Sequence, residues 1–333
     1  MIETKVSQSI YGAAYLESIS TTSSYHRRLQ VRPNLGEKIR HHLEFAELNL
    51  QTNIFPPFSL PQDAAVLHPA PSDDIEWLTF SAQAALSGDI LKYWQELIPE
   101  RDKIRGRTGT KIALSNLSQG NLTNAGHDNP QYFDDIAMIR ALGIALVHHD
   151  NEELMRQNVL FDAGVTHAED GIWAAEAIGS LVWKLVNSMD RNKAISETVD
   201  QLPSDSWLSA TVSRALKQCE SAQGVFDRIL VLEREIIDQV PSHPNSAPET
   251  LACLLAHAKY ATSISEFLFA GLAHPRLADS LPALHGALAG LLFGETWLPK
   301  EISSTIPPLT GCCLPRLAGF TLGHLIEQIA AGS

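Results

Sequence analysis

The sequence predicts an all-α protein, and three observations carry this prediction. Apolar residues recur every three or four positions through most of the 333 residues, which is the period of an amphipathic helix. No stretch of useful length alternates apolar and polar residues as a half-buried strand does. Residues that favour helix starts precede several of these segments, as in Ser72-Asp73 and Ser246-Ala247-Pro248-Glu249. We therefore expect one compact bundle of many helices.

The helical period is clearest in six segments, expected at residues 75–86, 134–147, 172–186, 225–240, 250–272 and 281–293. Three polar or proline-rich segments are expected to be long loops, at residues 54–72, 115–131 and 299–314. None of these loops has the length or charge of a disordered linker, and no internal repeat stands out. Residues 1–333 are therefore expected to form a single domain.

Charge and cysteine content exclude several classes of protein. The chain has 25 Lys and Arg against 38 Asp and Glu, a formal net charge of −13, which disfavours nucleic acid or an anionic membrane as the main partner. Its four cysteines show no C-x-x-C spacing, and adjacent Cys312-Cys313 is typical neither of a zinc site nor of a disulfide. No apolar run reaches the length of a membrane span, and no secretion signal is evident. We expect a cytoplasmic protein, and the sequence leaves its oligomeric state open.

Two acidic clusters about two hundred residues apart are the strongest functional signal. One is Ser72-Asp73-Asp74, and the other is Asp279-Ser280, which precedes a helix rich in glycine and alanine. Adjacent carboxylates repel each other unless a cation or donors neutralise them, and carboxylate and hydroxyl oxygens suit Mg²⁺. Helix capping is the competing interpretation, and for Asp279-Ser280 in isolation it is the better one. If the clusters meet, they could share one ion or a pair of ions.

Two further segments are candidates for contact with a substrate. His127, Asp128 and Asn129 lie in a polar loop before a helix, and we expect them to line the same pocket as Asp73 and Asp279. An ordinary turn with a helix cap explains this loop about equally well. His167 follows Thr166 at an expected helix start. It is expected to support the pocket or bind substrate rather than bind a metal ion.

These segments together resemble the ADP-ribosylglycohydrolase family, whose members have an all-α fold and depend on Mg²⁺. Ser72-Asp73-Asp74-Ile75 is similar to the family's Thr-Asp-Asp-Thr segment, and Leu277-Ala278-Asp279-Ser280 to its late Asp-x-Asp-Thr segment. Weaker similarities at residues 11–16, 135–146 and 166–167 extend the resemblance over most of the chain. The resemblance implies that the metal ligands are Ser72, Asp73, Asp74, Asp279 and Ser280. It also implies catalytic roles for Asp73, Asp74 and Asp279.

The departures from the family pattern concern the metal site. Leu277 stands at the first Asp of the late motif, and Ile75 stands where the family has a hydroxyl. Because a leucine cannot bind Mg²⁺, a two-ion site is expected to keep one strong ion and to lose or weaken the other. The opening helix lacks the family's Gly-Asp step, and Glu17 is the nearest acidic residue.

The resemblance implies a Mg²⁺-dependent hydrolase that cleaves a ribosyl bond in an ADP-ribosylated protein, nucleotide or small molecule. Mg²⁺ would orient the ribose hydroxyls and a water molecule. The alternative is a non-catalytic protein that binds ADP-ribose, and Leu277 favours it. A third possibility is Mg²⁺–diphosphate chemistry of the terpene-synthase type, indicated by Asp73-Asp74-Ile75-Glu76. The companion Asn-Asp-x-x-Ser-x-x-x-Glu motif of that class is missing, which places this possibility last.

Overall fold

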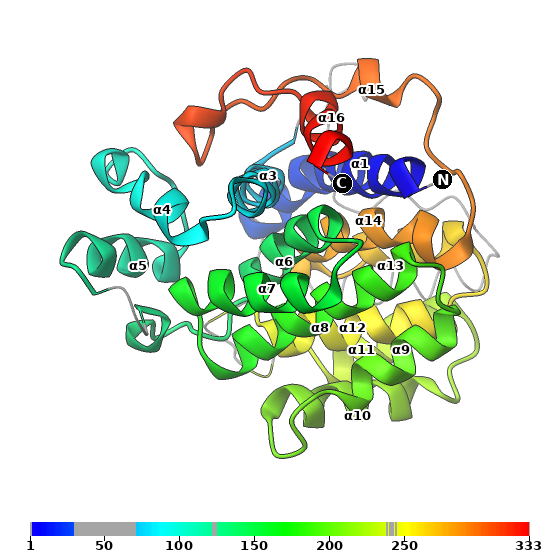
Figure 1. Ribbon diagram of the computed structural model, residues 1–333. Helices are drawn as coiled ribbons and strands as arrows, with labels where there is room; N and C mark the ends of the chain where they lie inside the picture. The colour runs from blue at the N-terminus through cyan, green and yellow to red at the C-terminus, as the bar shows by residue number, and fades with distance from the viewer. Residues whose placement is uncertain are drawn as a thin grey trace.

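The computed structural model describes residues 2–29 (of 21–29 the backbone alone), 71–121, 125–237, 239, 243 and 245–332. Within these ranges the chain is helical and has no β-strand, so the predicted all-α fold is confirmed (Figure 1). The loop expected at residues 54–72 lies outside the described residues except for its last two positions.

The described α-helices are, in chain order, α1 (Ile2–Leu29), α3 (Asp73–Ser87), α4 (Ile90–Gln95), α5 (Thr108–Ser118), α6 (Ile136–Val147), α7 (Glu152–Thr166), α8 (Glu169–Val186), α9 (Arg191–Asp200), α10 (Trp207–Cys219), α11 (Val225–Glu235), α12 (Ala247–Tyr260), α13 (Ile264–Leu272), α14 (Leu281–Phe293), α15 (Ile302–Thr305) and α16 (Leu322–Gly332). The described 3-10 helices are η2 (Ile98–Glu100), η3 (Ala125–Asp128), η4 (Pro275–Leu277) and η5 (Pro315–Leu317). Helices α3, α6, α8 and α14 match their expected positions to within three residues at each end.

Several expected boundaries were wrong. The helix expected at residues 250–272 is two helices, α12 and α13, because the chain is extended at Ala261 and Ser263. The hydroxyl of Ser263 accepts a hydrogen bond from the backbone N–H of Glu266 and so starts a new helix. The helix expected at residues 225–240 ends at Glu235.

Two expected loops contain helical turns. Helix α5 extends into the expected loop at residues 115–131, because Asn116 and Leu117 bury their side chains beside Leu114. The short helix η3 lies in the same segment, and the single turn α15 lies in the expected loop at residues 299–314. The polar composition of this segment predicted a loop, although its first residues form the end of α5 and bury a short face.

One continuous hydrophobic core joins helices from both ends of the chain. Every residue of α6 is buried, and α3, α7 and α8 pack around it (Figure 1). The one charged residue of α6, Arg140, donates from Nε to Asp162 Oδ2 over 2.7 Å. Because a buried guanidinium requires a paired anion, this contact fixes α6 against α7.

Helices α1 and α14 form the most extensive helix–helix contact among the described residues. They cross where a glycine of each meets the backbone of the other. A Cβ atom at Gly12 would lie 2.3 Å from the carbonyl oxygen of Gly286, and one at Gly286 would lie 2.0 Å from that of Gly12. The small residues of α14 thus allow a close crossing, which positions the start of α14.

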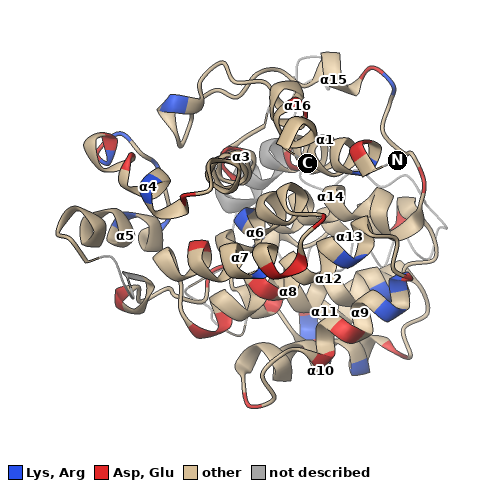
Figure 2. Ribbon diagram, in the orientation of Figure 1, with Lys and Arg blue, Asp and Glu red and all other residues tan. Residues whose placement is uncertain are grey.

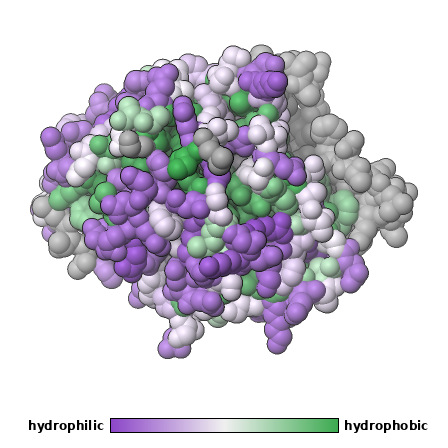
Figure 3. All heavy atoms as spheres, turned by 45° about the vertical axis from the view of Figure 1, so that its right-hand side comes forward, coloured by the Kyte–Doolittle hydropathy of each residue, from purple (hydrophilic) through white to green (hydrophobic). Residues whose placement is uncertain are grey.

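The described residues show no single charged or apolar surface in Figures 2 and 3. Basic residues are scattered over several helices rather than gathered on one (Figure 2). On the face drawn in Figure 3, the apolar side chains of the described residues form separate patches between polar ones. Among the described helices, none combines the length and the apolar character that crossing a lipid bilayer requires.

Candidate active site

Five helices begin at one place, and the residues at their starts form the candidate site. The N-cap positions are Ser72 of α3, Arg107 of α5, Asp135 of α6, Ser246 of α12 and Ser280 of α14. Because the backbone N–H groups at a helix start carry partial positive charge, this junction favours anionic side chains.

Backbone pairing aligns two of these helix starts. The N–H of Asp135 donates to the carbonyl of Asn245 over 3.1 Å, and the N–H of Ala247 donates to that of Phe133 over 2.7 Å. Asp134 and Ser246 face each other in this isolated bridge. The starts of α6 and α12 are therefore fixed side by side, although more than 100 residues separate them.

The guanidinium of Arg107 lies among carboxylates from distant segments. Its Nη1 donates to Asp134 Oδ1 over 3.0 Å and to Asp135 Oδ1 over 2.5 Å. Its Nη2 donates to Asp279 Oδ2 over 3.2 Å and to the hydroxyl of Ser280 over 3.0 Å. Burial alone opposes the charge of Arg107, but Asp135 and Asp134 hold its pKa well above the ordinary value. Arg107 is therefore the cationic centre of this acidic group.

Further hydrogen bonds orient the partners of Arg107. Asp135 accepts from Ser280 Oγ over 2.9 Å and from Thr250 Oγ1 over 2.7 Å. Asp279 accepts from Asn245 Nδ2 over 2.7 Å. The two sequence clusters also approach each other, because Arg107 Nη2 lies 3.9 Å from Asp74 Oδ1 and 3.2 Å from Asp279 Oδ2.

Glu17 of α1 holds the acidic start of α3. Its carboxylate accepts hydrogen bonds from the backbone N–H groups of Ser72 and Asp74, over 2.9 and 3.2 Å, and from the Ser72 hydroxyl over 2.6 Å. Ser72 occupies the N-cap position as expected, but its own side chain makes no capping bond. Glu17 thus supplies a cap from another helix, and it fixes the backbone that carries Asp73 and Asp74.

Asp74 carries a buried carboxyl group without a hydrogen-bond donor. Both of its carboxylate oxygens are buried and have no partner, and Arg107 at 3.9 Å is beyond hydrogen-bonding distance. Burial raises the pKa of Asp74 well above the ordinary value, and the charges of Asp73 and Asp279 add to this effect. Burial likewise raises the pKa of Asp73, and it raises that of Glu17 to about 8 with a contribution from Asp73. The nearby charge of Arg107 opposes these shifts but does not cancel them, so the α3 side of the site is short of positive charge.

A chain of buried hydrogen bonds supports the other side of the site. Arg140 donates to Thr166 Oγ1 over 2.6 Å, and Thr166 contacts His167 Nδ1 over 2.6 Å. The Nε2 atom of His167 lies 3.1 Å from Asp134 Oδ1. Since Asp134 accepts at that oxygen, His167 carries its proton on Nε2 and is a hydrogen-bond donor. Although burial opposes ionisation, His167 and Arg107 lower the pKa of Asp134 well below the ordinary value.

The residues expected to bind substrate differ in their surroundings. His127 and Asp128 are exposed, and Asp128 accepts from Asn116 Nδ2 over 3.1 Å. Asn129 is buried and donates to the carbonyl of Thr166 over 3.0 Å. His167 is buried behind Asp134. Substrate contact by these residues stays a prediction.

Leu277, at the position of the missing aspartate, has no exposed surface and belongs to the main hydrophobic core.

The sequence did not predict Arg107, Asp134 or Asp135 as site residues. One signal was present, because a basic residue at a helix start opposes the helix dipole unless anions surround it. Arg107 directly before Thr108-Gly109-Thr110 is such a residue.

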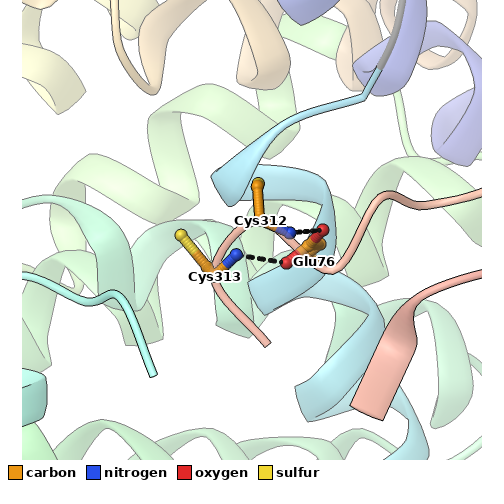
Figure 4. Close-up of side chains that lie close together, drawn as sticks. All are labelled: Glu76, Cys312 and Cys313. Atoms are coloured by element: carbon orange, nitrogen blue, oxygen red, sulfur yellow. Dashed lines mark hydrogen bonds between the residues drawn. The ribbon is translucent and has the colours of Figure 1, made fainter. Parts of the chain in front are cut away.

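A second cluster, Glu76 with Cys312 and Cys313, lies one helical turn from Asp73 (Figure 4). Among the described His, Cys, Asp and Glu residues, it is the one group of three or more with ligand atoms within 4.8 Å of one another. The carboxylate of Glu76 accepts from the backbone N–H groups of Cys312, Cys313 and Leu314, each over 2.8 Å. A hydrogen bond with Cys312, together with burial, raises the pKa of the Cys313 thiol. The three backbone hydrogen bonds to Glu76 anchor the loop at Cys312–Leu314 against α3.

The comparisons with known proteins agree with this architecture. The profile of the ADP-ribosylglycohydrolase family matches residues 5–330. This chain belongs to the ADP-ribosylglycohydrolase family. A solved structure titled "ADP-ribosylglycohydrolase-related protein complex" is similar, with a TM-score of 0.56 and 16% sequence identity, over 99% of this chain and 96% of that one. That identity is low enough that the likeness shows the fold alone. No curated protein sequence matches.

Proposed function

We propose that this chain hydrolyses an ADP-ribosyl or related ribosyl glycosidic bond, and that one Mg²⁺ ion binds at Asp73 and Asp74. Family membership supports a glycohydrolase. The observation that carries the metal assignment is the pair of buried Asp74 oxygens without a donor. A fully buried carboxylate needs a compensating partner, and a hard cation is one that carboxylate and hydroxyl oxygens bind well.

The α3 side of the site fits a hard cation. Ser72, Asp73 and Asp74 supply a hydroxyl and two carboxylates on consecutive residues, and Glu17 holds their backbone in place. Asp279 is near enough to Asp73 and Asp74 to raise their pKa values. When bound there, Mg²⁺ would polarise the ribose oxygens and lower the pKa of a coordinated water.

Asp279 is the side chain best placed to accept a proton. Its carboxylate is 17% exposed, whereas that of Asp74 is 1% exposed. Asn245 and Arg107 both hold its Oδ2 atom, so the carboxylate has a fixed orientation at the edge of the site. An oriented, accessible carboxylate can take the proton of an attacking water molecule.

A groove at α5 suits the phosphate groups of the substrate. It has a volume of about 760 Å³ and is lined by residues of the segment that follows η2 and by residues of α5. Arg101, Arg105 and Lys111 line it, together with one acidic residue, Asp102. The groove reaches Gly106, which directly precedes Arg107 in the chain. In a protein with a net charge of −13, this local basic surface would attract a diphosphate.

A non-catalytic protein that binds ADP-ribose is the second candidate, and Arg107 favours it. The guanidinium already pairs Asp279, Asp134 and Asp135. A site whose carboxylates are hydrogen-bonded in this way can hold a ribose through fixed hydrogen bonds without a metal ion. The ligand would again be ADP-ribosylated or nucleotide-like, and we place the protein in the cytoplasm.

Calorimetric titration with ADP-ribose, in Mg²⁺ and in EDTA, tests both candidates, together with an assay for ADP-ribose released from an ADP-ribosylated protein. The hydrolase predicts Mg²⁺-dependent binding and release, and both are lost in Asp74→Asn. Asp205→Asn, which alters an exposed acid, is the matched control. Binding in EDTA without release supports the non-catalytic protein. No binding in either buffer contradicts both candidates.

Arg105→Glu should weaken binding at least about tenfold if the groove holds the phosphates.

A further inference from the structure

We propose that Arg107 takes the place of a divalent cation on the α6–α14 side of the site, so that this side binds no metal ion. Arg107 would supply the positive charge at Asp135, Asp279 and Ser280 in place of a metal ion. This role does not depend on whether Asp73 and Asp74 bind Mg²⁺ or on whether the chain is catalytic.

The guanidinium uses the oxygen atoms that a metal ion would need. The two terminal nitrogens of an arginine carry four N–H groups in a planar fork. On Arg107 these nitrogens contact four acceptors, namely Asp134, Asp135, Asp279 and Ser280. Ser280, expected as a metal ligand, donates its own proton to Asp135 over 2.9 Å. Its hydroxyl therefore serves a hydrogen-bond network that is already complete around the guanidinium.

Arg107 is held in this position from several directions. It is the N-cap residue of α5, with φ −65° and ψ 170°, so that its backbone is fixed by the helix start. Its side chain is 16% exposed. Asp134 is held by His167, Asp135 by Thr250 and Asp279 by Asn245. A cation could enter only if the guanidinium left four oriented acceptors, and the displaced charge would remain close to the ion.

The two sides of the site consequently differ in their need for a cation. The carboxylates beside Arg107 have N–H and O–H donors. The carboxylate of Asp74 has none. An arginine keeps its charge at every physiological pH and requires no free metal ion. The α6–α14 side thus has a permanent positive charge among its carboxylates, whatever the metal supply.

The number of bound Mn²⁺ ions per chain tests this inference, measured by equilibrium dialysis with elemental analysis. The variants are Arg107→Gln, which removes the charge, and Arg107→Lys, which keeps it. Arg214→Gln is the control, because it removes an exposed arginine paired with Glu235. We expect at most one ion in the wild type, the same count in Arg107→Lys and Arg214→Gln, and one additional ion in Arg107→Gln.

Two ions in the wild-type chain would overturn the inference without any variant. A folded Arg107→Gln protein with the wild-type count would also overturn it. If Arg107→Gln unfolds in EDTA, its thermal unfolding midpoint in Mn²⁺ tests the inference. If Arg107 replaces a cation, Mn²⁺ should restore the midpoint of the variant. If Arg107 is only structural, Mn²⁺ should leave that midpoint unchanged. A wild type with no ion and an Arg107→Gln variant with one ion would support the inference while removing the Mg²⁺ ion from the proposed function.

Discussion

His167 and Asp134 form a buried hydrogen bond, with Nε2 and Oδ1 3.1 Å apart and no exposed side-chain surface on either residue. Asp134 is in turn the partner of Arg107, so the histidine expected to bind substrate supports the cationic centre from behind. We predict that His167→Ala lowers the free energy of unfolding by about 3 kcal/mol, because it removes a donor and leaves a cavity. Urea denaturation measures the loss. His127→Ala, at an exposed position, should stay within about 0.5 kcal/mol of the wild type.

Asp74→Asn should abolish Mg²⁺ binding and leave the free energy of unfolding in EDTA little changed or slightly higher. The reason is that the Asp74 carboxyl is buried without a hydrogen-bond donor, so it contributes little to stability until a cation binds. Asp162→Asn is the matched control, since that carboxylate is also buried but accepts from Arg140 and Trp94. Its loss should cost about 3 kcal/mol or more. A similar cost for Asp74→Asn would show that Asp74 has a structural partner.

Gly286→Ala should destabilise the protein by about 2 kcal/mol, because the added methyl group meets the backbone of α1 at 2.0 Å. The added methyl group should also push α14 away from α1. This would displace the start of α14, next to Asp279 and Ser280, and weaken ligand binding. Gly164→Ala on α7 is the control, since a Cβ atom there meets no atom within 4 Å. That change should stabilise the protein by up to about 1 kcal/mol. Thermal unfolding of both variants makes the comparison.

The helices and the two acidic clusters were predictable from the sequence because their signals are local. The apolar period of α14 and the serine and aspartate residues at the start of α3 each lie within a few neighbouring positions. The role of Arg107 was not predictable in the same way. Its acceptors lie 27 to 173 residues further along the chain, and no periodicity within α5 indicates which of them it contacts. The Ser263 cap that divides α12 from α13 was visible in the sequence but was outweighed by the continuous apolar pattern.

Acid should destabilise the protein through His285 of α14. This ring is buried, it stacks on Phe267 at 4.3 Å between centroids, and its Nε2 atom has no partner. Burial lowers its pKa to about 3; the hydrogen bond with the Leu281 carbonyl opposes this shift, and His274 adds to it. The folded-state pKa of His285 lies below its pKa in the unfolded chain, so the unfolded chain takes up the proton first as the pH falls. The free energy of unfolding is therefore unaffected by His285 above about pH 6.5 and decreases as the pH falls toward 3. His285→Phe should remove up to about 1.4 kcal/mol per pH unit of this slope. An unchanged slope in the variant would show that His285 does not carry it.

Leu277→Asp should lower the free energy of unfolding by more than about 3 kcal/mol and leave the metal count unchanged. The side chain is fully enclosed by the main core, so a carboxylate there would be buried without a partner. Urea denaturation and Mn²⁺ dialysis measure the two outcomes. An additional ion in a folded Leu277→Asp protein would mean that Leu277, rather than Arg107, accounts for the missing cation.

The three backbone amides at Cys312–Leu314 that bind Glu76 have a consequence for the order of folding. Glu76 and Leu314 are 238 positions apart, and Glu76 lies in the first turn of the helix that carries Asp73 and Asp74. During synthesis, α3 leaves the ribosome long before the segment that satisfies its buried carboxylate. Since a buried charge without donors is unfavourable, the nascent α3 cannot settle in its final environment until that segment arrives. The acidic site is therefore among the last parts of the molecule to be completed, although its defining residues are synthesised early.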